Sequence, residues 1–221
     1  MRKAGFLAVA LALGLTVACN KDNASNNANG STVGTAGRAD NGVSSGDRDF
    51  VRDVASMNAA EIELGRLASQ RAASPDVKQF AQMVVTDHTS AGDKLKAFAS
   101  QHAIDVPAQI SDKDRDLQQK LSEKQGLEFD KAYADAMVDQ HQSLVDKLES
   151  RIDKDTLSKA KANNPNGPDG KIQATAVMPE KSDDANTMGL NQWAADTYPV
   201  AYAHLQAAKD LRDGVKKRST N

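Results

Sequence analysis

Residues 74–98 read SPDVKQFAQMVVTDHTSAGDKLKAF, and this stretch decides the fold class. Its start predicts a helix N-terminus: Ser74 can cap the first turn, Pro75 suits the first helical position, and Asp76 suits the positive end of the helix dipole. The apolar side chains that follow recur every three or four residues, which places them on one helical face. That face holds Val77, Phe80, Val84, His88, Ala91, Leu95 and Phe98. We therefore predict an amphipathic helix with a histidine in the middle of its apolar face.

The same spacing predicts three more long helices, over about residues 47–72, over 127–152 and from 186 onward. Their aligned positions are Phe50, Val54, Met57, Glu61, Leu64 and Ala68; then Tyr133, Met137, His141, Leu144 and Leu148; then Trp193, Thr197, Val200, His204, Ala207 and Leu211. A proline inside the last pattern, Pro199, predicts a kink or a restart. A short helix is expected over 111–124, ended by Gly126. Four amphipathic helices without strand-like alternation predict an all-α four-helix bundle with one extra short helix.

The first 19 residues have the form of an export signal. Basic Arg2 and Lys3 precede an apolar run that ends near Leu15, and Cys19 follows small Ala18. This pattern resembles a bacterial lipoprotein signal of residues 1–18, in which Cys19 is lipidated and becomes the first mature residue. The resemblance also implies an outer-membrane location, facing the periplasm, because the next residue is Asn rather than Asp. An ordinary signal peptide with an incidental cysteine is the alternative.

Two segments lack the helical pattern. Residues 19–46 are rich in Asn, Gly and Ser and hold few large apolar side chains, so we predict a disordered tether. Residues 153–186 hold several prolines and the run Asn163-Asn164-Pro165-Asn166-Gly167, and predict an irregular insertion. The folded domain is expected to span 47–217, with this insertion between its third and fourth long helices.

Charge and cysteine content exclude several classes of protein. Of 28 basic side chains, two lie in the signal, which leaves 26 against 30 acidic ones and a formal charge of −4. This mixed, mildly acidic composition shows no basic footprint for nucleic acid. With a single cysteine, no intramolecular disulfide can form, so stability must come from the core. The membrane contact that we expect is through the lipid on Cys19, and protein partners are not indicated.

Four ionisable residues, Glu61, His88, His141 and His204, occupy the apolar faces of four different helices. Glu61 precedes Ser74 by 13 residues and His88 follows it by 14, so at about 1.5 Å per residue they lie level with each other. His141 and His204 also lie near the centres of their helices. Because buried polar groups need partners, we predict that the four meet in one layer.

Such a layer has two interpretations. One Glu and three His would suit a single metal ion, with zinc, iron, copper or manganese as candidates. The alternative is a hydrogen-bonded polar core without metal. A di-iron oxidase is disfavoured, because its Glu-x-x-His motifs are absent: Val85, Val138 and Ala201 stand three residues before the three histidines.

Several of these segments resemble the bacterial domain-of-unknown-function family 4142. The resemblance is carried by Ala60-Glu61-Ile62-Glu63-Leu64-Gly65-Arg66, by the segment from Phe80 to Thr89, and by Phe129-Asp130-Lys131-Ala132-Tyr133. It covers residues 47–152 well and 187–212 more loosely. It implies a ferritin-like helical bundle, usually exported, without an established activity. Glu61, His88, His141 and His204 match the recurring polar positions of the family.

No motif for nucleophilic catalysis or phosphate binding is found in the sequence, so catalytic residues are not predicted. The function that we predict is that of an envelope lipoprotein whose bundle binds one metal ion in its core. The alternative is a structural or interaction protein with a hydrogen-bonded polar core. An enzyme would need an open coordination position and a path for substrate to the core.

Overall fold

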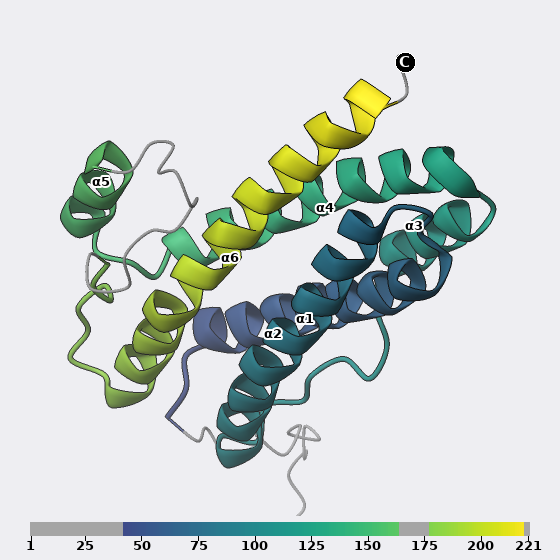
Figure 1. Ribbon diagram of the computed structural model, residues 1–221. Helices are drawn as coiled ribbons and strands as arrows, with labels where there is room; N and C mark the ends of the chain where they lie inside the picture. The colour runs from purple at the N-terminus through teal and green to yellow at the C-terminus, as the bar shows by residue number, and fades with distance from the viewer. Residues whose placement is uncertain (1–41, 164–176, 219–221) are drawn as a thin grey trace, which may run out of the picture. The chain divides into compact units, whose positions relative to one another are not determined.

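The computed structural model describes residues 42–163 and 177–218, and this part of the chain is an all-α helical bundle (Figure 1). Its six helices are α1 (Ser45–Arg71), α2 (Pro75–Gln101), α3 (Asp112–Ser122), α4 (Gly126–Glu149), α5 (Lys154–Asn163) and α6 (Ala185–Arg218). The four long ones are those that the apolar periodicity predicts. The expected signal 1–18, Cys19 and most of the tether lie outside the described residues.

The long helices form a bundle in which α1 packs along α2 and α4 along α6, while contacts of α1 with α4 and of α2 with α6 close it. The starts of α2 and α4 lie together, because the Asp130 carboxylate accepts hydrogen bonds from the backbone N–H groups of Ala73 (3.0 Å) and Ser74 (2.8 Å). Residues 102–125, including α3, therefore cross from the end of α2 back to the start of α4 (Figure 1). A single long crossover of this kind is the connectivity of ferritin-like bundles.

Two helix boundaries that were predicted from local sequence signals have different outcomes in the structure. Gly126 adopts φ +58°, a left-handed conformation that favours glycine, and separates α3 from α4 as predicted. Ser74 was expected to cap α2, but its side chain makes no capping bond and its buried hydroxyl has no partner. The Asp130 carboxylate arrives from α4 and binds the backbone of this turn instead, which a local sequence pattern cannot reveal.

The two segments predicted to be irregular are partly structured. Val43 is buried and Ser44 accepts a hydrogen bond from Asp47 N (3.1 Å), so the core and the cap of α1 begin inside the predicted tether. Helix α5 lies within the predicted insertion 153–186. It forms because the Asp153 carboxylate accepts from Thr156 N (2.9 Å) at its start and because it buries Leu157 and Ala160. Two apolar side chains are too few to produce a recognisable helical periodicity in the sequence.

The connection after α4 is also pinned to the bundle. Asp153 N donates to Met178 O and Glu180 N donates to Arg151 O, both at 2.9 Å. Helix α6 then runs through Pro199 as one helix, so the expected restart is wrong. Pro199 is buried within this helix. Within the described residues, no helix is long and apolar enough to cross a membrane.

Candidate functional site

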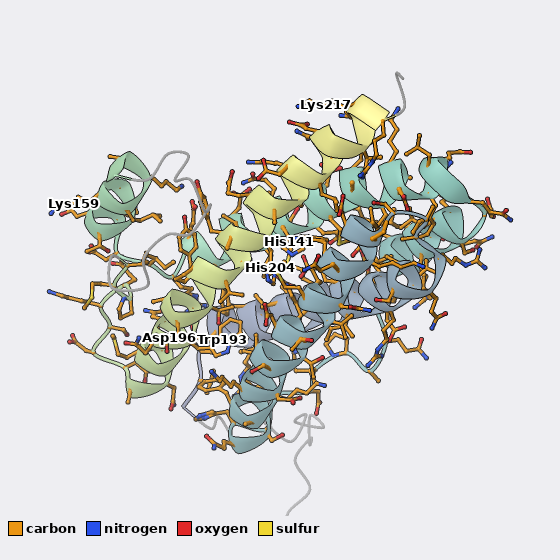
Figure 2. The ribbon with its side chains drawn as sticks, viewed as in Figure 1. His141, Lys159, Trp193, Asp196, His204 and Lys217 are labelled. Carbon is orange, nitrogen blue, oxygen red and sulfur yellow. The ribbon has the colours of Figure 1, made fainter. Side chains whose placement is uncertain are left out.

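The four predicted residues meet in the middle of the bundle. Glu61 comes from α1, His88 from α2, His141 from α4 and His204 from α6, and none is more than 4% exposed. The three imidazole rings lie with their centroids 5.3–5.4 Å apart. Figure 2 shows His141 and His204 side by side where α4 and α6 pass each other. The four side chains, which the sequence places at the same height along the bundle, therefore form a compact cluster.

His88 is held by two side chains of α1. Its Nδ1 lies 2.7 Å from Glu61 Oε2 and 3.1 Å from Asn58 Oδ1. The contact with Asn58 is a hydrogen bond, and the Glu61 carboxylate makes a close charge contact with the same nitrogen. The amide Nδ2 of Asn58 also donates to the backbone carbonyl of His88 (2.9 Å). Nδ1 of His88 therefore carries a hydrogen and faces away from the other two rings.

Gly92 makes room for the Asn58 side chain. A Cβ atom at position 92 would lie 2.5 Å from Asn58 Nδ2, far inside van der Waals contact. Asn58 is 8% exposed and its two polar ends both bind His88, so it cannot move aside without losing those bonds. The close approach of α1 to α2 at Gly92 thus positions His88.

The other two histidines are oriented in a similar way. His204 Nε2 lies 2.9 Å from Asp87 Oδ2, across the boundary between α6 and α2. His141 Nδ1 donates to the backbone carbonyl of Met137 (2.9 Å), with Glu61 Oε1 3.7 Å away. Since carbonyl and carboxylate oxygens only accept, the outward nitrogen of each ring is an N–H donor.

The remaining nitrogens face one another. Nε2 of His88 lies 3.3 Å from Nδ1 of His204, and Nε2 of His141 is buried with no hydrogen-bond partner. One ring nitrogen from each histidine lies within 4.8 Å of the other two. In the neutral tautomers that the outward bonds select, all three inward nitrogens carry lone pairs. Three converging lone pairs repel one another unless a cation lies between them.

The charges and the burial of the cluster favour protonation of one of the three histidines over the other two. Burial alone would raise the pKa of Glu61, but the fields of His141 and His88 outweigh it and lower the pKa to about 2. Burial lowers the pKa of His88, yet the Glu61 carboxylate raises it above its ordinary value. Burial and His88 keep the pKa of His141 low despite Glu61. Burial, His141 and His88 lower the pKa of His204 to about 4. As the pH falls, His88 is therefore the first ring to take up a proton.

An aromatic wall closes one side of the cluster. The Phe80 ring lies 6.0 Å from His141, 6.4 Å from His204 and 6.4 Å from Tyr133, measured between centroids. The Tyr133 hydroxyl in this wall is buried and has no hydrogen-bond partner among the described residues. Burial, with the charge of Glu61, raises the pKa of Tyr133 and keeps it neutral.

Two residues of the site were missed or misassigned from the sequence. Asn58 lies four residues after Val54 and three before Glu61, so the spacing of the apolar face could have included it in place of Met57. Asp87 directly precedes His88 in the sequence, but it binds His204 of α6. No sequence signal indicates that pairing, because it joins residues that are 117 positions apart.

Comparison with known proteins gives one match. A protein-family model described as Domain of unknown function (DUF4142) matches residues 33–163, which is more than half of the chain. The matched range includes Glu61, His88 and His141, whereas His204 lies beyond it. No curated protein and no solved structure matches the chain.

Proposed function

The chain belongs to the family described as Domain of unknown function (DUF4142), and we propose that it binds one divalent transition-metal ion through His88, His141 and His204. The observation that carries this proposal is the orientation of the rings. Each outward nitrogen is held by an oxygen acceptor, and each inward nitrogen faces the other two. Buried imidazoles oriented by carboxylates and carbonyls are the usual surroundings of a metal-binding histidine.

The spacing of the nitrogens suits a small ion. Two nitrogens that bind one zinc at about 2.0–2.1 Å in tetrahedral geometry are about 3.3 Å apart. The His88 and His204 nitrogens are 3.3 Å apart, and one nitrogen of His141 lies within 4.8 Å of a nitrogen of each of the other two rings. Three neutral imidazoles suit zinc, copper or iron, whereas manganese favours oxygen ligands. Three protein ligands leave a fourth position for water or an added molecule.

Glu61 takes a supporting role in this proposal. Its carboxylate contacts Nδ1 of both His88 and His141 and so lies behind the rings, on the side away from the inward nitrogens. Its negative charge offsets part of the charge of a bound divalent cation in the buried core. Among the described residues the candidate ligand group holds three histidines and no bridging carboxylate, which suits a single ion.

A second candidate function uses a proton in place of the metal. The 3.3 Å contact between His88 and His204 can be a hydrogen bond when His88 is protonated, and Glu61 then neutralises the charge. In that case the cluster is a structural polar core. Addition of metal to the protein separates the two candidates.

The test is a thermal melt of tag-free, chelator-treated protein with and without zinc. Binding to the folded form alone at about 100 times Kd adds about 2.7 kcal/mol, which corresponds to roughly 5–10 °C for a domain of this size. We expect His141→Ala to abolish the zinc-dependent increase. His102→Ala is the matched control, because His102 caps the end of α2 outside the cluster. An increase of equal size in both variants, or none in the parent protein, would refute the metal site.

We propose further that the bundle is attached to the bacterial envelope through a lipid on Cys19. The support is the basic start, the apolar run and the position of Cys19 after Ala18. Cys19→Ala should remain unprocessed or appear as a soluble species, and Asn20→Asp should keep the lipidated protein in the inner membrane. Normal maturation and outer-membrane fractionation of Cys19→Ala would contradict this anchor.

A further inference from the structure

The histidine cluster is closed on the side where α1 packs against α2. A Cβ atom at Gly65 would lie 2.8 Å from Val85 Cγ2, and one at Gly92 would lie 2.5 Å from Asn58 Nδ2. The first of these contacts lies about one helical turn from the cluster in one direction along the bundle, and the second about one turn in the other. Close packing on both sides of the cluster therefore leaves no room for an ion to pass between α1 and α2.

The opposite arrangement is found where α2 faces α6. A cavity of about 210 Å³ is lined by Asp87, by His88 and by Ala201, which stands three residues before His204. A groove of about 400 Å³ is lined by Ala207, which stands three residues after His204. Between these two hollows, Asp87 Oδ2 and His204 Nε2 join the helices at 2.9 Å. Side chains therefore fill the space between α2 and α6 less completely than the space between α1 and α2.

Asp87 is also the most exposed of the side chains that hold the outward nitrogens. Its side chain is 40% exposed, whereas that of Glu61 is 0% exposed and Asn58 is 8% exposed. Exposed side chains change rotamer within nanoseconds. Asp87 can thus release His204 and turn toward solvent without disturbing the core.

Two further charged side chains, Asp196 of α6 and Lys94 of α2, lie on the cavity wall. Figure 2 shows Asp196 nearer the start of α6 than His204 is. Asp196 stands eight residues before His204 and Lys94 seven after Asp87, so each is about 10–12 Å farther along its helix. Their charges are opposite and offset each other. The charge closest to the cluster on this wall is therefore the carboxylate of Asp87, which attracts a cation.

We propose that the metal ion enters and leaves the cluster between α2 and α6, and that the Asp87–His204 pair is the gate of this path. The inference rests on the proposed function, because it concerns the same ion. Asp87 turns outward, its bond to His204 Nε2 breaks, and the freed ring turns aside to admit the ion to the inward nitrogens. When the bond forms again, it holds the ring in the orientation that binds the ion.

The rate of zinc release tests this path. Zinc-loaded, tag-free protein is mixed with an excess of a chromophoric chelator, which gives the release rate constant. Equilibrium competition with the same chelator gives Kd, and the release rate constant divided by Kd gives the uptake rate constant.

Two serine variants locate the path. Ser90 is exposed, lines the cavity and stands two residues after His88, so Ser90→Lys places a positive charge beside the path. Ser143→Lys is the matched control, because Ser143 is exposed two residues after His141 on α4 and does not line the cavity. A charge beside the path raises the barrier in both directions, so Ser90→Lys should slow uptake and release by the same factor, roughly threefold, with Kd unchanged. Ser143→Lys should leave both rate constants at the values of the parent protein.

Asp87→Ala tests the gate. Without the bond to His204, release should be about tenfold faster or more, as for the loss of other groups that orient a metal-binding histidine. Uptake should also be faster, because no bond has to break before the ion enters. If release becomes faster but uptake does not, Asp87 only positions His204 and the gate is refuted.

The two proposals fail in different ways. If zinc binds at equilibrium but leaves Ser90→Lys as fast as it leaves Ser143→Lys, the path between α2 and α6 is wrong and the metal site stands. If the parent protein binds no zinc at equilibrium, the metal site falls and the path falls with it.

Discussion

Replacement of Gly92 by alanine should destabilise the bundle, although alanine normally stabilises a helix. The new Cβ would lie 2.5 Å from Asn58 Nδ2, so the Asn58 side chain has to leave its place. It would lose its bonds to the His88 carbonyl (2.9 Å) and to Nδ1 of His88 (3.1 Å), inside the core. A buried polar group left unsatisfied costs about 1–3 kcal/mol, against a helix-propensity gain of about 1 kcal/mol. The difference between these two terms is a net loss of up to about 2 kcal/mol.

Gly214→Ala is the matched control, because Gly214 is also helical and a Cβ atom there meets nothing within 4 Å. It should raise the free energy of unfolding by about 0.5–1 kcal/mol, as the intrinsic propensities require. Both variants can be compared by urea denaturation of zinc-free protein. If Gly92→Ala stabilises the protein as much as Gly214→Ala does, the argument from close packing at Asn58 is wrong.

A double-mutant cycle tests the cause directly. In an Asn58→Ala background the clash disappears, so Gly92→Ala should then stabilise the protein as it does at an ordinary helical site. The zinc-dependent rise in melting temperature should also be smaller in the Gly92→Ala single variant, since His88 is no longer held. Additive effects of the two substitutions would show that Gly92 and Asn58 act independently.

Three further predictions concern the polar core and the start of the domain. The pKa of His204 is about 4 in the folded chain, against 6.5 for an ordinary solvent-exposed histidine, so the unfolded chain binds more protons between these values. The free energy of unfolding of zinc-free protein should therefore fall as the pH drops from 6.5 toward 4, and pH-independent urea midpoints would contradict this. Tyr133→Phe should be neutral or stabilising by up to about 1 kcal/mol in the same denaturation assay, because the lost hydroxyl has no partner. A protein that begins at Asp47 should melt below one that begins at Gly42, since it lacks buried Val43 and the Ser44 cap, and equal melting temperatures would contradict this.

The helices and their register could be read from the sequence because they depend on short-range periodicity. Spacing of three and four residues selects one helical face, and a fixed rise per residue sets the height of each side chain. These two facts suffice to place Glu61 level with His88 and to predict that the four polar residues meet. The same method failed at α5, where Leu157 and Ala160 alone carried the pattern.

What the tertiary structure alone decided is which atoms of these residues face each other. The sequence places four side chains in one layer, but the orientation of a ring depends on partners from other helices: Asn58 of α1 for His88, and Asp87 of α2 for His204. Crossing geometry and the close approach at Gly92 set those pairings. Hydrogen bonds are directional and act over about 3 Å, whereas sequence periodicity specifies only a face and a height. The inward-facing nitrogens therefore follow from helix packing.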